Sequence, residues 1–154
     1  MTPAVNAAKK LKIPFNLHKY KHDPEHGAYG IEAAEKLNID PARVYKTLVA
    51  QLDNNELTVA IIPVQSKLNL KAYARTCAAK KAEMAEAAVV TKSTGYVLGG
   101  VSPMGQKKRL KTYLDTSAKE FSTIYVSAGK RGLEIELNPE DLLRATGGSY
   151  FTNT

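Results

Sequence analysis

The 154-residue sequence predicts a single domain of the α+β class. Three observations support this prediction. Strand-like runs come in pairs joined by short polar turns, segments with helical spacing are scattered among them, and strand and helix do not alternate regularly. A hydrophobic fraction of 44% is enough for one core. No repeat, low-complexity tract or linker divides the chain, so we expect one domain over residues 1–154.

Helix boundaries are predicted from capping residues. The predicted helices cover 3–12, 31–37, 70–79, 85–91 and 139–146, with a further helical turn from Asp40-Pro41. Three of these helices follow residues that typically cap the free N–H groups of a first turn: Thr2, Asn69 and Asn138. Pro occupies the first position of the first and last helices, where its missing N–H has no effect. The last helix is expected to stop at Gly147, a typical C-terminal cap.

Strands are predicted from alternation and from the turns between them. The predicted strands cover 15–20, 46–52, 57–64, 112–115, 123–127 and 133–137. In the first strand, Tyr20 lies on the face opposite to the apolar side chains. The polar residues 53–56 join two apolar runs into a hairpin. Residues 130–132 form the turn between the last two strands.

The positive charge is concentrated in one window. The formal net charge is +7, and ten of the 22 basic residues lie between Gln65 and Lys111, where only Glu83 and Glu86 oppose them. Such a concentration attracts polyanions by long-range attraction and counterion release. A solvated basic surface without a partner explains the same pattern, and charge alone does not decide between the two interpretations.

Composition excludes several classes of protein. No apolar run approaches the roughly 20 residues that a membrane span needs. The first residues lack the basic-then-apolar order of a signal peptide, so we expect a cytoplasmic protein with no membrane partner. The single cysteine, Cys77, excludes an internal disulfide framework and a four-cysteine zinc site. It falls on the apolar side of its predicted helix and is expected in the core.

The three histidines do not match a metal-binding motif. His18, His22 and His26 lie close together, but their spacing fits neither an HExxH helix nor a zinc knuckle, and Pro24 interrupts them. We therefore expect surface histidines. The sequence predicts no metal and no other cofactor.

Two features are candidates for binding or catalysis. Lys46 begins an apolar strand, so it either extends its charge into solvent or supplies a point charge to a phosphate or an oxyanion in a cleft. Tyr20 either lines the same cleft or is exposed. The glycine-rich loop 99–105 lacks the Lys-Ser/Thr of a phosphate-binding loop, and is either a wide turn or a rigid loop whose backbone approaches a ligand. No Ser-His-Asp set and no carboxylate pair of recognisable spacing is present.

Five motifs follow one another along nearly the whole chain. They are Tyr20 after the first helix, VYKTL at 44–48, STGY at 93–96, GGVSPMG at 99–105 and YVSAGKRG at 125–132. In this order and spacing they resemble the prolyl-tRNA editing family, most closely its free-standing YbaK-type branch of Cys-tRNA(Pro) deacylases. The resemblance implies a mixed, barrel-like β-sheet surrounded by helices, with the aminoacylated end of a tRNA in a cleft beside the sheet.

The resemblance also implies roles for individual residues. Lys46 corresponds to the essential lysine of the family. Tyr20 and Glu134 complete the implied catalytic set, although many members have Asp where this chain has Glu134. The implied substrate-binding residues are Thr47, Gly99, Gly100, Ser127 and Gly129. From the charge pattern and the last motif, we expect contacts to the tRNA backbone from Lys107, Lys108, Arg109, Lys130 and Arg131.

The implied activity is removal of cysteine from mischarged Cys-tRNA(Pro), and also from Cys-tRNA(Cys), without ATP or metal. In the YbaK-type branch the substrate thiol attacks its own ester carbonyl and closes a thiolactone, so no protein nucleophile is needed. A second site of this kind corrects the limited discrimination of synthetases between small amino acids. The expected partners are the acceptor ends of tRNA(Pro) and tRNA(Cys), and a prolyl-tRNA synthetase in a transient complex. Two alternatives stay open: an Ala-tRNA(Pro) deacylase, and a non-catalytic tRNA-binding module associated with the synthetase.

Overall fold

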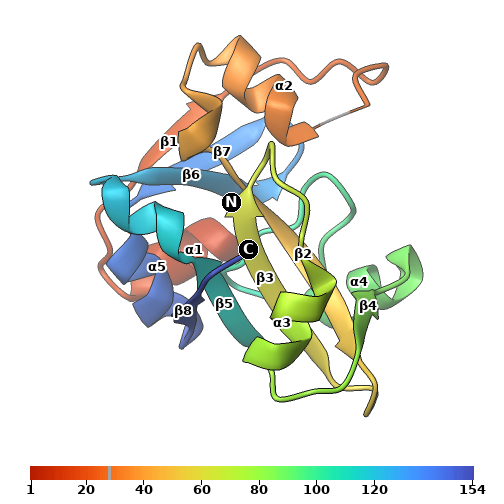
Figure 1. The fold of residues 1–154 in the computed structure, drawn as a ribbon. Helices are drawn as coiled ribbons and strands as arrows, with labels where there is room; N and C mark the ends of the chain where they lie inside the picture. Colours follow the sequence, from red (N-terminus) through yellow and green to blue (C-terminus); the bar gives the residue numbers. More distant parts are fainter. Residues whose placement is uncertain (28) are drawn as a thin grey trace.

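Two β-sheets form the framework of the computed structural model, which describes residues 1–27 and 29–154 (Figure 1). The helices are α1 (Pro3–Lys10), α2 (Tyr29–Lys36), α3 (Leu70–Thr76), α4 (Ala87–Thr94) and α5 (Pro139–Thr146), with 3₁₀ helices η1 (Pro41–Arg43) and η2 (Thr116–Glu120). The strands are β1 (Asn16–Lys19), β2 (Tyr45–Leu52), β3 (Leu57–Pro63), β4 (Ala82–Met84), β5 (Lys111–Asp115), β6 (Ile124–Lys130), β7 (Leu133–Leu137) and β8 (Ser149–Phe151).

The two sheets differ in strand direction. The smaller sheet has the order β1-β7-β6 and is antiparallel throughout. The larger has the order β4-β2-β3-β5-β8, in which β3–β5 and β5–β8 are parallel. An isolated parallel bridge between Val44 and Tyr125 joins the residue before β2 to β6, so the sheets meet at this corner. The predicted α+β class with mixed strand pairing is confirmed, and the described strands do not close into a barrel.

The predicted helix caps are present. The side-chain oxygens of Thr2, Asn69 and Asn138 accept hydrogen bonds from backbone N–H groups in the first turns of α1, α3 and α5. Gly147 ends α5 in the left-handed conformation, at φ +67°. The Thr2 hydroxyl also donates to the carbonyl of Ala128 in β6, which fixes the start of α1 against the smaller sheet.

The main core lies between the two sheets. It includes Ile61 of β3, Leu114 of β5, Ile135 of β7 and Leu142 of α5, all fully buried. A second cluster packs α3 on the other face of the larger sheet, and α2 covers the outer face of the smaller sheet (Figure 1). The smaller sheet therefore has helices or strands packed on both faces.

Two short strands were not predicted from the sequence. β4 and β8 have three residues each, and they are strands because β2 and β5 supply their hydrogen-bond partners. Local alternation does not distinguish such short segments from loops. α4 runs from Ala87 to Thr94, somewhat later than predicted, and ends at Gly95 with φ +82°.

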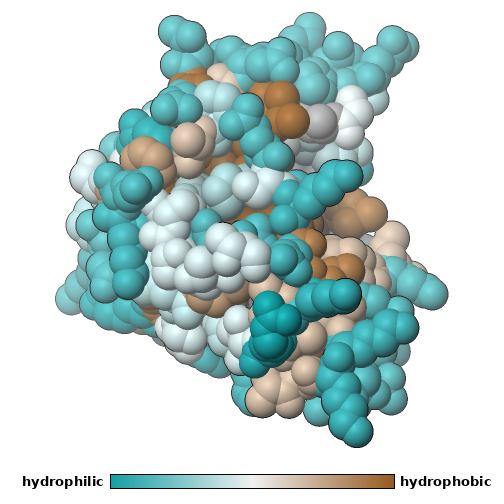
Figure 2. Space-filling view, in the orientation of Figure 1, coloured by the Kyte–Doolittle hydropathy of each residue, from teal (hydrophilic) through white to brown (hydrophobic). Residues whose placement is uncertain are grey.

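Figure 2 shows hydrophilic residues around the rim of this face, residues of intermediate hydropathy across its middle, and small hydrophobic areas near α2 and beside β2. Among the described residues, no helix has both the length and the apolar character that a membrane crossing requires.

Candidate active site

A cavity of about 360 Å³ lies where the two sheets meet. Its walls come from the start of β2, from β6 and β7, from the first turn of α2 and from the loop after α4. Six residues predicted from the sequence line it: Tyr20, Lys46, Thr47, Gly99, Ser127 and Glu134. The fold thus brings together residues that come from both ends of the chain.

The cavity lies beside an edge of β2 that β4 does not cover. β4 pairs only with Ala50–Leu52, whereas β3 pairs along the whole strand. Leu52 donates to Glu56 and Val64 donates to Val44, so even-numbered positions of β2 hydrogen-bond to β3. Thr47 therefore directs its N–H and C=O away from β3, along the uncovered edge. Its side-chain Oγ1 is buried and has no hydrogen-bond partner among the described residues.

Lys46 brings a positive charge to the cavity without a counterion. The side chain is half-buried, and none of the ion pairs among the described residues involves it. Burial, together with the nearby charge of Lys67, lowers the pKa of Lys46. An ammonium group in this setting attracts an anion or polarises a carbonyl oxygen.

Glu134 and Tyr20 are both neutral near pH 7. Glu134 lies in β7 between Ser127 of β6 and His18 of β1, is 6% exposed, and burial raises its pKa to about 8. Tyr20 is held by a 3.0 Å hydrogen bond from its N–H to the carbonyl of Gly132. Burial, and next the negative charge that Glu134 can carry, raise the pKa of Tyr20 to about 12. Two neutral hydrogen-bond donors therefore accompany the charge of Lys46.

Two of the predicted substrate-binding glycines do not line the cavity. A Cβ at Gly100 would lie 2.9 Å from Cα of Lys130, so this glycine permits close contact between its loop and the turn after β6. A Cβ at Gly129 would lie 2.8 Å from the ring of Tyr96. Both glycines serve close packing behind the cavity wall.

Sequence reasoning missed the apolar walls of the cavity. Tyr29 and Ile31 of α2, Tyr45 of β2, and Leu98 and Val101 of the loop all line it. Aromatic and aliphatic residues at such positions are typical of a core. Tyr45 and Val101 lie inside the VYKTL and GGVSPMG motifs, whereas the sequence contained no signal for Tyr29, Ile31 and Leu98. The orientation of Tyr45 is fixed by a 2.6 Å hydrogen bond to Ser117, which donates to Asp115 at 2.6 Å.

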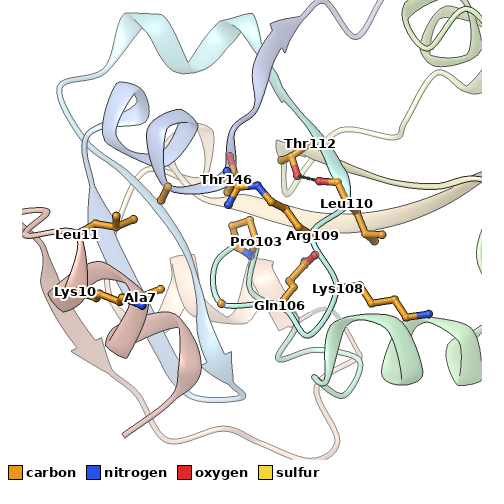
Figure 3. Close-up of a pocket in the computed structure, with 12 residues that line it drawn as sticks. Ala7, Lys10, Leu11, Pro103, Gln106, Lys108, Arg109, Leu110, Thr112 and Thr146 are labelled. Carbon is orange, nitrogen blue, oxygen red and sulfur yellow. Dashed lines mark hydrogen bonds between the residues drawn. The ribbon is translucent and has the colours of Figure 1, made fainter.

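The five residues predicted to contact the tRNA backbone lie in two places. Lys108 and Arg109 line a second cavity, of about 270 Å³, with Lys10 of α1 (Figure 3). In that view Arg109 points towards Thr146 and Lys108 points away from the cavity. Lys107 is exposed in the same loop, whereas Lys130 at the end of β6 and Arg131 in the turn that follows lie beside the first cavity.

The histidines and the cysteine have separate surroundings. His18, His22 and His26 lie next to three different carboxylates, those of Glu136, Glu32 and Glu35. In residues 1–27 and 29–154, no group of three or more potential metal ligands is close enough to hold an ion. Cys77 packs against the second core cluster, and burial raises the pKa of its thiol, which makes it a weak nucleophile.

Comparison with known proteins identifies relatives over most of the chain. Residues 25–145 match the family model described as the aminoacyl-tRNA editing domain. The chain is 38% identical over 149 residues to a protein of Enterococcus faecalis named "Putative Cys-tRNA(Pro)/Cys-tRNA(Cys) deacylase EbsC". The aligned region covers 97% of this chain and 90% of that protein. The chain is 31% identical over 111 residues to the uncharacterized protein YwhH of Bacillus subtilis, covering 72% of this chain and 70% of the relative.

Solved structures share the fold. A crystal structure titled "a putative trans-editing enzyme for prolyl tRNA synthetase" superposes with a TM-score of 0.79 at 19% identity. The match covers 99% of this chain and 97% of that chain.

Proposed function

This chain belongs to the aminoacyl-tRNA editing domain family, and from that membership we propose that it is a trans-editing deacylase that removes cysteine from Cys-tRNA(Pro) and Cys-tRNA(Cys). The relative that shares 38% identity is named for this pair of substrates. One observation carries the proposal: a cavity in which Lys46, without a counterion, accompanies the neutral donors Tyr20 and Glu134. This set stabilises negative charge on a carbonyl oxygen.

The cavity suits the aminoacylated end of the tRNA. Its volume of about 360 Å³ is within the range of small-ligand sites, so the amino acid and its ester enter while the body of the tRNA stays outside. We assign the orphaned Oγ1 of Thr47 and the hydroxyl of Ser127, which line the same cavity, to hydrogen bonds with the polar groups of the amino acid. The backbone of Gly99 borders the same space.

The thiol of the substrate cysteine supplies the nucleophile. Its sulfur forms a bond to the carbonyl carbon, the bond from that carbon to the ribose oxygen breaks, and the thiol proton ends on the released hydroxyl of the tRNA. Lys46 stabilises the oxyanion that develops on the carbonyl oxygen. Glu134, with a pKa of about 8, exchanges a proton readily near neutral pH and is assigned to the proton transfer. The part of the lining that the structure describes contains neither Cys nor His.

The test is deacylation of a matched set of tRNAs. Cys-tRNA(Pro) and Cys-tRNA(Cys) are expected to be cleared, and Ser-tRNA(Pro) more than 100-fold more slowly. A pocket alone separates such near-isosteres by about 100-fold at most, so a larger ratio indicates that the thiol itself reacts. S-methylcysteinyl-tRNA(Pro) keeps the sulfur and blocks its attack, and is expected to be stable.

Each other outcome points to a different function. Fast hydrolysis of the S-methyl substrate contradicts the thiolactone step and indicates an activated water. Clearance of Ala-tRNA(Pro) with no action on the cysteine substrates supports the alanine-specific alternative. Binding of tRNA without turnover supports the non-catalytic module. Cys77→Ala is the control: it is expected to deacylate normally, because Cys77 packs against the second core cluster and is not among the described residues that line the cavity.

A further inference from the structure

The turn between β6 and β7 contacts two segments that form the mouth of the cavity. Nε and Nη2 of Arg131 donate to the carbonyl of Leu98, at 3.0 and 2.7 Å. The guanidinium carbon lies 4.7 Å from the centre of the Tyr29 ring. Leu98 and Tyr29 both line the cavity, so one side chain connects the loop after α4 to the first turn of α2.

Glycines allow these segments to approach closely. Gly99 has φ +84°, and a Cβ there would lie 2.7 Å from the Tyr29 ring. The ring is therefore in contact with Gly99 as well as with the guanidinium of Arg131. On its other side the turn is fixed to Tyr20, because Gly132 accepts a hydrogen bond from the Tyr20 N–H and a Cβ at Gly132 would lie 2.7 Å from the Tyr20 carbonyl.

These contacts require arginine. Two N–H groups of one planar guanidinium converge on a single carbonyl while its face stacks on an aromatic ring, a combination that the point charge of lysine does not provide. A contact to a tRNA phosphate makes a weaker demand, since lysine also binds phosphate. The exposed position of Arg131 is compatible with either role, but its described contacts are with the cavity mouth.

We propose that Arg131 is a positioning residue that fastens the cavity mouth, by holding the Leu98 carbonyl and the Tyr29 ring in place around the amino-acid end of the substrate. The identity of this substrate rests on the proposed function, whereas the contacts of Arg131 with Leu98 and Tyr29 are a property of the fold. Loss of Arg131 frees the loop over residues 97–101 from α2, so the substrate is held less tightly although Lys46 and Glu134 remain in place.

The kinetic test compares Arg131→Ala and Arg131→Lys on two substrates, Cys-tRNA(Pro) and the cysteine ester of adenosine, which has no phosphate. Both variants are expected to raise KM about tenfold on both substrates, with a smaller change in kcat, because a charge-assisted hydrogen bond contributes about a factor of ten to an equilibrium. Arg144→Lys, at an exposed position of α5 that lines neither cavity, is the matched control. The proposal is overturned if Arg131→Lys behaves as wild type on the tRNA and neither variant affects the ester, because a phosphate contact gives that pattern.

Amide hydrogen exchange tests, without any substrate, whether Arg131 holds the loop over residues 97–101 against α2. Residues 97–101 are expected to exchange faster in Arg131→Ala, in Arg131→Lys and in Tyr29→Leu, while the β2–β3 hairpin keeps its protection. Unchanged exchange at 97–101 in folded variants overturns the proposal. If the wild-type chain cleaves none of the esters, the proposed function fails, and the exchange measurement still decides the role of Arg131.

Discussion

The cavity at Lys46 and the cavity at Arg109 both carry positive charge, but their charged groups are held differently. In the first cavity Lys46 and Glu134 lie on strands and are half-buried or buried, and burial shifts both of their pKa values. In the second cavity Lys10, Lys108 and Arg109 lie on a helix end and a loop, and all three are exposed (Figure 3).

Buried charged groups and exposed charged groups are suited to different tasks: the former to a chemical step, the latter to attracting a polyanion. A group removed from water interacts more strongly with its neighbours and titrates at an altered pH, which is what proton transfer and oxyanion stabilisation require. An exposed cation is screened within about 10 Å at ordinary ionic strength, and it attracts a polyanion without taking part in chemistry. We therefore expect substitutions in the first cavity to change turnover and those in the second to change tRNA affinity.

Lys46→Ala is expected to give the largest effect. Deacylation at saturating Cys-tRNA(Pro) should fall by at least about 100-fold, because removal of one oxyanion-stabilising group typically lowers kcat by that factor. Lys46→Ile sharpens the result, because isoleucine favours a strand and removes only the charge. Lys92→Ala, at an exposed position of α4 and in the lining of neither cavity, is the control for general loss of charge. Near-normal turnover in both Lys46 variants, with melting temperatures like the wild type, would remove Lys46 from the chemistry.

Glu134→Gln is expected to change how stability depends on pH. The folded protein keeps a proton on Glu134 up to about pH 8, whereas the unfolded chain releases it near the ordinary glutamate pKa. The contribution of Glu134 is therefore full at acidic pH and is lost as the pH rises through that range, by up to about 1.4 kcal/mol per pH unit.

Urea unfolding between pH 5 and 9 measures this slope as the difference between wild type and Glu134→Gln. The difference between the two free energies of unfolding should change with pH up to about pH 8 and level off above it, where Glu134 is deprotonated in both states. Two parallel curves would show that Glu134 is not held protonated. Arg109→Gln in the second cavity is the comparison and should leave the slope as it is in wild type.

Gly99→Ala is expected to have an intermediate effect. Alanine at φ +84° is strained, and its Cβ would lie 2.7 Å from the Tyr29 ring, so we expect a loss of about 1–3 kcal/mol in the free energy of unfolding together with reduced turnover. Gly27→Ala is the stability control, since nothing lies within 4 Å of a Cβ at that position. Equal stability of the two variants would show that the loop adjusts freely.

Charge reversal in the second cavity is expected to have the smallest effect on turnover. Lys108→Glu and Arg109→Glu should weaken binding of all tRNAs alike and leave the rate at saturation nearly unchanged. Each lost phosphate contact reduces the slope of log affinity against log salt by about 0.7 to 0.9. Binding titrations between about 50 and 200 mM salt measure this slope. An unchanged slope in both variants would identify this surface as solvated and unrelated to tRNA.

The sequence predicted those parts of the fold that depend on local patterns. The hairpin β2–β3 and the caps Thr2, Asn69 and Asn138 were identified because turn and cap residues act within a few positions of themselves. β4 and β8 depend on partner strands, and three residues carry too little alternation to indicate them.

The candidate site was predictable only in part. From its own pattern Lys46 fitted a solvent-exposed strand end better than a cleft, and the family motifs supplied its assignment. The burial of Glu134 and the orphaned hydroxyl of Thr47 depend on packing between segments that are distant in the sequence. The contacts of Arg131 with Leu98 and Tyr29 depend in the same way on tertiary structure. The roles of Gly100, Gly129 and the basic residues in tRNA binding stay predictions.

The pairing of β1 with β7 also has a consequence for folding. The hydrogen-bonded residues His18 and Glu136 are 118 positions apart in the sequence, and the hydrogen-bonded pair Thr2 and Ala128 are 126 positions apart. Formation of the smaller sheet therefore brings together segments from near the two ends of the chain. Chains dominated by such distant pairings fold slowly, on the scale of milliseconds to seconds. During synthesis Tyr20 leaves the ribosome long before its neighbours on β7 exist. The cavity that contains Lys46 is therefore expected to form late, only after β7 has emerged, and a nascent chain that stops before Leu133 is expected to have none of the proposed deacylase activity.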